Sequence, residues 1–244
     1  MFDKTQKVLV ISGHAADYVW RAGGTIAKYL NHGAEVKVVV LSMGVRGESN
    51  DLWDQPNQTY ENVRKIRKSE SMAAAECLGV KDIEFWDFED YYMDLESEER
   101  ITRLAKLIRD FEPYHIITHG ELDLLNPDHD AVNKFVFKAS VLAISNGVPI
   151  EGSKTSKQTR IFGFEPHQSE ICNFKPEVII DITETIEKKE AAMNCFKAQK
   201  HLIEYYGMKA FIRGNHARRL SGSKQYKFAE SFTRRFPYVG EWLV

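Results

Sequence analysis

The sequence predicts a Rossmann-like α/β sandwich of three layers, in which helices cover both faces of a mainly parallel sheet. The first observation is that residues 7–12 and 36–41 are continuous aliphatic runs, typical of strands buried on both faces. The second is a helical apolar stripe between them, at residues 20–32, which ends at Gly33. The third is that strand-type and helix-type segments go on alternating along the chain. Such units form right-handed crossovers between parallel strands.

The later elements are predicted from the same two periodicities. Further strands are expected at residues 83–86, 115–119, 160–164 and 178–182. Further helices are expected at residues 59–78, 97–111, 132–143 and 183–206, the last with Thr183 as its cap. The polar segment 51–58 is expected to be a surface loop, although a lid is the alternative. Residues 226–232 fit either a late strand or a short helix.

The connector at residues 145–158 is polar and rich in Gly, Ser and Lys, but the strand pattern resumes after it. We therefore expect one domain over residues 1–244. Hydrophobic residues make up 43% of the chain and charged residues 28%, as in ordinary soluble globular proteins. The formal net charge of -2 gives no reason to expect nucleic acid or a membrane surface as a partner.

Targeting and cysteine signals point to the cytoplasm. No apolar run is long enough to span a bilayer, and the N-terminus lacks the layout of a signal peptide. The three cysteines are widely spaced and odd in number, so they form no disulfide framework. We expect a cytoplasmic protein with reduced thiols.

Two loops that follow predicted strands carry side chains suited to a metal. His14 and Asp17 come directly after the first strand, and His129 lies in the loop after the fourth. The carboxyl ends of parallel strands meet at one sheet edge, where open α/β folds bind ligands. Two imidazoles and one carboxylate leave an open position on zinc, as a catalytic site requires. A His-x-x-Asp spacing also occurs where a carboxylate caps a helix, and spacing alone leaves that alternative open.

Several segments resemble the PIG-L/LmbE-like zinc deacetylase superfamily. They are ISGHAAD at 11–17, AGGTIA at 22–27, NPDH at 126–129 and an Arg-x-x-Glu pair, Arg67 and Glu70, on the 59–78 helix. The resemblance covers most of the chain and implies the fold of that superfamily.

The resemblance also implies a ligand set. By it, one zinc ion is held by His14, Asp17 and His129, which are the residues that the strand-end pattern indicates. Asp128 would lie beside them and orient a partner or the substrate.

The sequence departs from the deacetylase pattern where the general base is expected. The superfamily motif reads His-Pro-Asp-Asp-Glu, and here its first Asp falls on Ala16 and its Glu on Tyr18. In the deacetylases that Asp takes a proton from zinc-bound water, which an alanine cannot do. The His of the second motif is replaced by Asn126. Deacetylation by the usual route of the superfamily is therefore not expected.

A narrower resemblance, to the 4-oxalomesaconate hydratases of gallate degradation, accommodates these departures. It rests on HAADYVWRAGG at 14–24, the segment 44–49 with Arg46 and Glu48, FEPHQ at 164–168 and the tyrosine pair 205–206. Those enzymes add water across a carbon–carbon double bond of an oxo-carboxylic acid. The subgroup implies that Glu48 replaces the missing Asp in proton transfer, with His167 as its partner.

A polycarboxylate substrate would also need cations. Arg46 and Arg67 are candidates to neutralise its carboxylates, because a guanidinium binds a carboxylate with two hydrogen bonds. Each assignment has a simpler alternative. Glu48 and Arg46 could be solvated loop residues, His167 a surface histidine, and Arg67 a partner of Glu70 on its helix.

The leading hypothesis is a zinc-dependent hydratase acting on 4-oxalomesaconate or a similar unsaturated oxo-carboxylic acid in aromatic-compound catabolism. The alternative is a zinc-dependent N-acetyl-sugar deacetylase that uses Glu48 as its base. A third possibility is a non-catalytic binding protein that retains the fold. We also expect a homo-oligomer, and the basic C-terminal segment suits a subunit contact, a polyanionic substrate or a solvated face.

Overall fold

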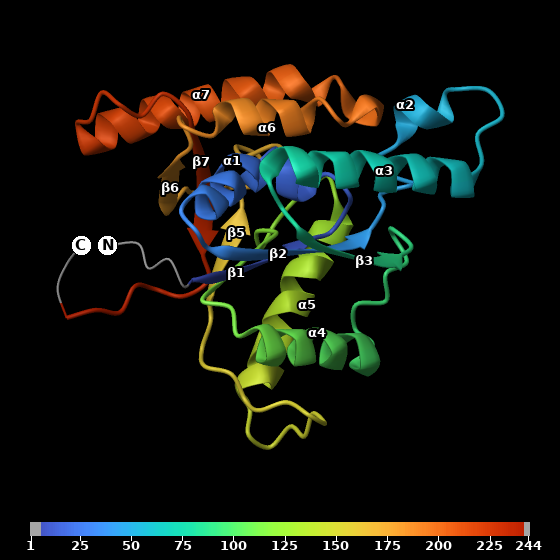
Figure 1. The fold of residues 1–244 in the computed structure, drawn as a ribbon, viewed down its shortest axis with the longest axis vertical. Coiled ribbons are helices and arrows are strands. Elements are labelled where there is room, and N and C mark those ends of the chain that lie inside the picture. Colours follow the sequence, from blue (N-terminus) through green and yellow to red (C-terminus); the bar gives the residue numbers. More distant parts are fainter. Residues whose placement is uncertain (1–5, 242–244) are drawn as a thin grey trace.

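The computed structural model describes residues 6–241, and within them the strands form one seven-stranded sheet (Figure 1). Its order is β3-β2-β1-β4-β5-β7-β6. The five strands from β3 to β5 are parallel, whereas β7 runs antiparallel to both β5 and β6. The strands are β1 Lys7–Ser12, β2 Glu35–Ser42, β3 Asp82–Phe88, β4 His115–Thr118, β5 Arg160–Phe164, β6 Val178–Asp181 and β7 Ala229–Arg234. The prediction of a mainly parallel sheet is confirmed.

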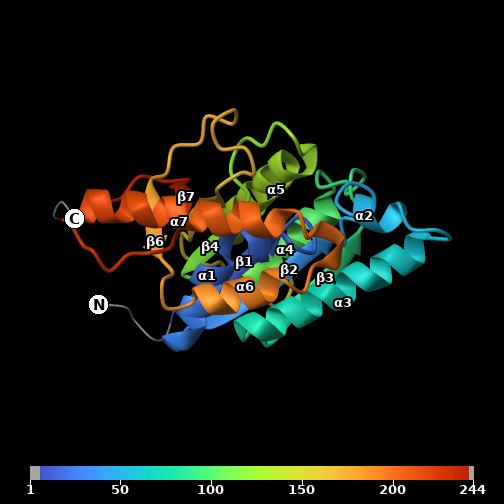
Figure 2. The same ribbon diagram turned by 90° about the horizontal axis from the view of Figure 1, so that it is seen from above.

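Helices cover both faces of the sheet, which confirms the three-layer sandwich. In Figure 1, α1, α3, α6 and α7 lie above the sheet, and α4 and α5 lie below it. Figure 2 shows α6 and α7 lying along the layer that contains α1 and α3. The helices are α1 Asp17–Asn31, α2 Asn50–Trp53, α3 Tyr60–Leu78, α4 Glu98–Phe111, α5 Pro127–Ile144, α6 Ile186–Met193 and α7 Leu202–Ser221, with a 3-10 turn η1 Lys197–Gln199. In the described part of the chain, no helix is long and apolar enough to cross a membrane.

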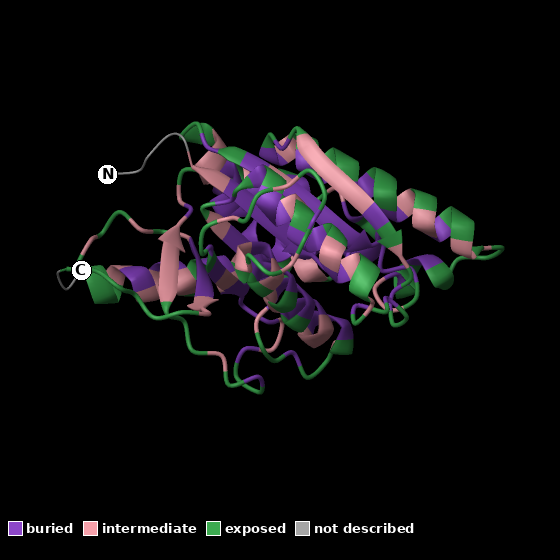
Figure 3. Ribbon diagram, turned by 90° about the horizontal axis from the view of Figure 1, so that it is seen from below, coloured by how far each residue is buried: buried purple, intermediate pink, exposed green. Residues whose placement is uncertain are grey.

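The core consists of two apolar layers separated by the sheet. Successive side chains of β1 point to opposite faces, so Val8 and Val10 pack under α1 while Leu9 and Ile11 pack against α4 and α5. All four are fully buried. The buried centre in Figure 3 corresponds to this doubly covered sheet. Burial on both faces explains why these strands are continuous aliphatic runs.

Two predicted helix boundaries are wrong. The expected helix at 183–206 is instead α6, η1 and α7, and α7 continues to Ser221. The break is fixed by tertiary contacts, because Glu70 accepts hydrogen bonds from the backbone N–H groups of Lys197 and Ala198. Thr183 does not cap a helix, and its hydroxyl accepts instead from the N–H groups that precede β7.

The second wrong boundary is at α5, which begins at Pro127 rather than at residue 132. Asn126 caps it by accepting from the N–H of Asp128 at 3.1 Å. Asp128 and His129 therefore lie on the first helical turn and not in a loop. The segment expected to be a surface loop also contains the short helix α2, and the strand alternative holds for the C-terminal segment, as β7.

Candidate metal centre

The end of β1 turns directly into α1, and this turn brings His14 and Asp17 together. The Ser12 hydroxyl donates to the His14 carbonyl at 2.7 Å and accepts from the N–H of Tyr18 at 3.1 Å. Asp17 Oδ2 accepts from the N–H of His14 at 2.8 Å. The residue at the N-cap position is Ala16, which makes no side-chain cap. The carboxylate of Asp17 thus binds the preceding turn and also faces the imidazoles.

Three potential ligand atoms form a nearly equilateral triangle. His14 Nδ1 lies 3.2 Å from Asp17 Oδ2 and 3.2 Å from His129 Nε2, and the third side is 3.4 Å. Bonds of about 2.0–2.1 Å to a tetrahedral zinc place its ligands about 3.3 Å apart. Among the described residues, Glu48 joins these three side chains in one cluster whose ligand atoms lie within 4.8 Å of one another. The spacing of the donors therefore fits a tetrahedral metal ion.

Each imidazole also has a carboxylate partner on its other nitrogen. His14 Nε2 lies 3.0 Å from Asp128 Oδ2, and His129 Nδ1 lies 2.9 Å from Asp123 Oδ2. A proton on these outer nitrogens leaves His14 Nδ1 and His129 Nε2 with free lone pairs directed into the cluster. Histidine ligands of metals are oriented in this way by carboxylates.

Glu48 enters the cluster from the turn after β2. Its Oε1 lies 3.1 Å from His14 Nδ1 and accepts a hydrogen bond from Asn126 Nδ2 at 3.2 Å. Gly44 makes this approach possible, because it has a φ of +65° and a Cβ there would lie 3.3 Å from the Cβ of His14. Ala16 is fully buried in the core and offers no carboxylate. Asp128 and Asp123 orient the two imidazoles, so Glu48 is the carboxylate beside the candidate ligands that orients neither of them.

Opposite charges control ionisation in the cluster. Burial disfavours the charged forms, but the negative charge of Glu48 and the hydrogen bonds to Asp128, Asp17 and Glu48 together outweigh it and raise the pKa of His14 well above its usual value. Burial is likewise outweighed for Asp17 by the charges of His129 and His119 and the hydrogen bonds to them. For Glu48 it is outweighed by the charge of His14, the hydrogen bond to His14 and the charge of His129, so both carboxyl pKa values are lowered. Both carboxylates are therefore ionised near neutral pH, the form in which they bind metals or accept protons.

His167 lies on the wall of the cavity that opens onto the cluster. The cavity has a volume of about 210 Å³, and its lining also includes Arg21, Glu48 and Tyr206. The His167 ring stacks on Tyr205 with a centroid distance of 4.4 Å. Burial, reinforced by the positive charge of Arg21, lowers the pKa of His167 to about 4. The imidazole is thus neutral at neutral pH and can accept a proton.

Comparison with known proteins identifies the family. A sequence profile of the PIG-L family, described as GlcNAc-PI de-N-acetylase, matches residues 9–140. The chain is 38% identical to a protein of Pseudomonas putida named 4-oxalmesaconate hydratase, over 98% of this chain and 93% of the relative. The chain belongs to the PIG-L family. The resemblance inferred from the motifs is therefore confirmed.

Other proteins resemble this chain to different degrees. A crystal structure described as the 4-carboxy-2-hydroxymuconate hydratase from Pseudomonas putida aligns with a TM-score of 0.93 at 38% identity, covering 98% of this chain and all of that one. A probable N-acetyl-α-D-glucosaminyl L-malate deacetylase of Bacillus cereus is 25% identical over 79% of this chain and 83% of its own length. An N,N'-diacetylchitobiose deacetylase from Pyrococcus horikoshii shares the fold, with a TM-score of 0.78 at 22% identity, over 94% of this chain and 83% of that one.

PIG-L enzymes are metal-dependent, and the cluster of His14, Asp17, Glu48 and His129 could bind a metal ion. The structure brings together the three side chains that the sequence predicts as ligands and places Asp128 on His14. Asp128 therefore lies behind His14, on the outer side of the cluster. Its Oδ2 also accepts from the N–H of Tyr91 at 2.9 Å.

The two predicted substrate-binding arginines do not line the cavity. Arg46 pairs with Glu89 at 2.6 Å, and its guanidinium packs over Tyr60 and Tyr92. Arg67 is fully buried behind the site. Its guanidinium donates to Gln199 at 2.9 Å and lies 3.9 Å from Glu48 Oε2. The pairing with Glu89 holds Arg46 outside the cavity, and Arg67 lies behind two residues of its wall, Glu48 and Gln199, so neither guanidinium lines the cavity.

Sequence reasoning missed two residues of this site. Arg21 is the one guanidinium that lines the cavity in the described part of the chain, and it lies 3.5 Å from Asp17 and 3.4 Å from Asp123. Arg21 stands inside the 14–24 motif, which was a signal that it belongs to the site. Asp123 stands in an irregular loop after β4, and no spacing marks it as the partner of His129.

Proposed function

We propose that this PIG-L protein is a zinc-dependent hydratase that adds water to the double bond of 4-oxalomesaconate or a similar unsaturated oxo-carboxylic acid in aromatic-compound breakdown. The hydratase relatives support the reaction, since they match nearly the whole chain at 38% identity, whereas the deacetylase of Bacillus cereus matches at 25%. The free cysteines support a reducing compartment, which we propose to be the cytoplasm.

The observation that carries the proposal is the position of Glu48. Its carboxylate lies against His14 in the candidate metal cluster, while the residue at position 16 is a buried alanine. A base is therefore available at the metal from the turn after β2 and not from α1. A proton of a bound water molecule would therefore be removed from the side of that turn. This position of the base supports a reaction other than the usual deacetylation of the superfamily.

The donor set favours zinc. His14, Asp17 and His129 would hold the ion, since two imidazoles and one carboxylate are donors that zinc accepts and the 3.2–3.4 Å spacing suits a tetrahedral site. When bound, zinc supplies a positive charge that stabilises the negative charge developing on the substrate's oxo oxygen.

Proton transfer is assigned to Glu48 and His167. Glu48 is ionised, so it can accept a proton from a water molecule as the water oxygen bonds to one carbon of the double bond. The adjacent carbon takes up a proton, which completes the addition of one water molecule. His167 is neutral and lines the same cavity, so it can accept the proton from Glu48 and return it to that carbon.

Substrate carboxylates are assigned to Arg21 rather than to Arg46 or Arg67. Arg21 lines the cavity and is only 8% exposed, and a desolvated guanidinium binds a carboxylate strongly. We assign Arg67 a different role. Its guanidinium, 3.9 Å from Glu48 Oε2, stabilises the ionised form of that carboxylate from behind.

Direct measurement of hydration tests the proposal. Purified protein loaded with zinc is mixed with 4-oxalomesaconate, and loss of the conjugated double bond is followed by ultraviolet absorbance. The expected result is turnover that requires zinc. Absence of turnover with this substrate and its unsaturated oxo-acid analogues would contradict the proposal.

The deacetylase alternative is favoured by the family profile and by the more distant relatives. It predicts release of acetate from N-acetylglucosamine derivatives, which a hydratase does not give. The same zinc-loaded protein therefore distinguishes the two functions in parallel assays.

A further inference from the structure

Asp90 lies in the loop after β3, and its carboxylate binds the backbone of the turn that carries Glu48. Its side chain is 1% exposed. Its Oδ1 accepts from the N–H of Val45 at 3.1 Å, and its Oδ2 accepts from the N–H groups of Arg46 and Gly47 at 2.7 and 2.9 Å. One buried carboxylate thus binds three successive peptide groups of the turn that ends in Glu48.

This turn is irregular, so its shape depends on such contacts. It closes with a hydrogen bond from the N–H of Glu48 to the carbonyl of Gly44 at 3.2 Å. A Cβ at Gly44 would lie 3.2 Å from the Cβ of Glu48. A Cβ at Gly47 would collide with the ring of Tyr91. The turn is therefore confined between the metal cluster on one side and the Asp90–Tyr91 segment on the other.

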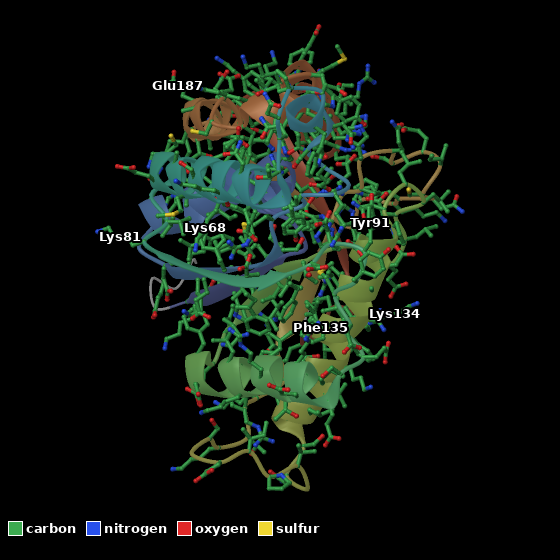
Figure 4. The ribbon with its side chains drawn as sticks, turned by 90° about the vertical axis from the view of Figure 1, so that its right-hand side faces the viewer. Lys68, Lys81, Tyr91, Lys134, Phe135 and Glu187 are labelled. Carbon is green, nitrogen blue, oxygen red and sulfur yellow. The ribbon has the colours of Figure 1, made fainter. Side chains whose placement is uncertain are left out.

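The same segment also reaches the metal side of the site. The N–H of Tyr91 donates to Asp128 Oδ2 at 2.9 Å, and this oxygen lies 3.0 Å from His14 Nε2. Figure 4 shows Tyr91 between the two helix layers, on the loop that follows β3. Tyr91 has a φ of +67°, a conformation that is uncommon for a residue with a Cβ, and its side chain lines the cavity. Asp90 therefore binds the turn that carries Glu48, and the next residue, Tyr91, binds Asp128, the carboxylate behind His14.

We propose that Asp90 is a positioning residue for hydration, because its bonds to residues 45–47 set the distance between Glu48 and His14. This inference rests on the proposed function, since it requires Glu48 to be the proton-transfer group. Asp90 itself does not line the cavity and needs no contact with the substrate. A shift of the turn by about 1 Å would misplace Glu48, and misplacements of that size cost about 10²-fold in rate.

Both oxygens of the Asp90 carboxylate accept hydrogen bonds from the turn. In Asp90→Asn one oxygen becomes an NH₂ group, which would face a peptide N–H and could not accept from it. The shape of the side chain is preserved, so the turn loses bonds without losing packing. The matched control is Asp87→Asn, the same change three residues earlier at the end of β3, since Asp87 is exposed and pairs with Arg64 on α3.

The experiment compares zinc-loaded wild type, Asp90→Asn, Asp87→Asn, Glu48→Gln and the double variant Asp90→Asn/Glu48→Gln in the 4-oxalomesaconate assay. We expect Asp90→Asn to lower kcat by about 10–100-fold with KM within about 3-fold, bound zinc equal to wild type and a cooperative melting transition. Asp87→Asn should match wild type. In the Glu48→Gln background, Asp90→Asn should change the residual rate by less than about 2-fold, because residues that act through one another are non-additive.

Three outcomes would overturn the inference. They are an unchanged kcat in Asp90→Asn, a loss of zinc proportional to the loss of activity, or an equal fold-loss in both backgrounds. Failure of the proposed function is a separate result, since it would appear as absence of turnover by the zinc-loaded wild type. Failure of the role of Glu48 is distinct again, since it would appear as a Glu48→Gln variant with the kcat of wild type, and it would overturn the inference as well.

Discussion

Glu48 Oε1 lies 3.1 Å from Nδ1 of His14, the nitrogen that faces Asp17 and His129. The two residues come from different strand ends, since His14 follows β1 and Glu48 lies in the turn after β2. Because Ala16 has no carboxylate, Glu48 is the carboxylate that joins the three candidate ligands on the side where their ligand atoms meet. The contact therefore joins the end of β1 and the turn after β2 in one cluster that could bind a metal ion.

We predict that Glu48→Gln lowers kcat for hydration by about 10²–10⁴-fold, the usual contribution of a positioned base. The amide keeps the shape of the side chain but cannot accept the proton. Zinc content, measured by elemental analysis, should stay at the wild-type value because His14, Asp17 and His129 remain. Glu61→Gln is the control, since its side chain on α3 is 78% exposed, pairs with Arg64 and lines no part of the cavity. Retention of wild-type kcat by Glu48→Gln would refute the assigned role.

A second prediction concerns Asp123, which lies 2.9 Å from His129 Nδ1. Asp123→Asn removes the charge that orients this imidazole, and loss of such a partner weakens metal binding by about 10–100-fold. Competition with a zinc chelator measures the effect. Glu121→Gln, an exposed residue of the same loop that pairs with Arg235, is the matched control. Equal zinc affinity in the two variants would show that Asp123 has no part in the site.

The three candidate ligands could be predicted from the sequence because each comes after a strand of a parallel sheet. Position after the carboxyl end of a strand indicates which sheet edge a residue occupies, and the motifs shared with the PIG-L family single out His14, Asp17 and His129 among such residues. Which guanidinium faces the cavity is set by packing instead. Arg46 lies next to Glu48 in the sequence, yet its pairing with Glu89 turns it away, whereas Arg21 reaches the cavity from α1.

The same distinction explains the errors in the fold. Residues 183–206 have helical periodicity throughout, and only the contact of Glu70 with the backbone at Lys197 and Ala198 shows where the helix is interrupted. The antiparallel strand β7 inserts between β5 and β6, and this long-range pairing leaves no local signal. Whether a segment is a helix or a strand can be predicted from its own residues. Where a helix is interrupted, and which strands pair, depends on residues that are distant in the sequence.

The ionisation of His167 provides a third prediction. Burial and the positive charges of Arg21 and Lys209 lower its pKa to about 4. Titration of the imidazole protons by NMR should therefore give a midpoint near pH 4. Lys209→Met removes one of these charges and should raise the midpoint towards the ordinary value of about 6.5. A midpoint near 6.5 in the wild type would contradict the neutral, proton-accepting role proposed for His167.

The last prediction concerns stability and His115, the first residue of β4. Its ring packs between Tyr114 and Phe162, and burial together with the charge of Arg160 lowers its pKa to about 4. The unfolded chain binds a proton at this histidine below about pH 6.5, whereas the folded chain does so only below about pH 4. Stability contributed by the neutral ring is therefore complete above pH 6.5 and is lost as the pH falls through this window.

The shift makes the free energy of unfolding about 2 kcal/mol lower at pH 4.5 than at pH 7 through this residue alone. His115→Gln keeps a polar side chain but cannot titrate, so the difference between the two pH values should shrink by about that amount. Urea unfolding of wild type and variant at both pH values measures it. An equal pH dependence in the two proteins would show that His115 is protonated in the folded state as readily as in the unfolded chain.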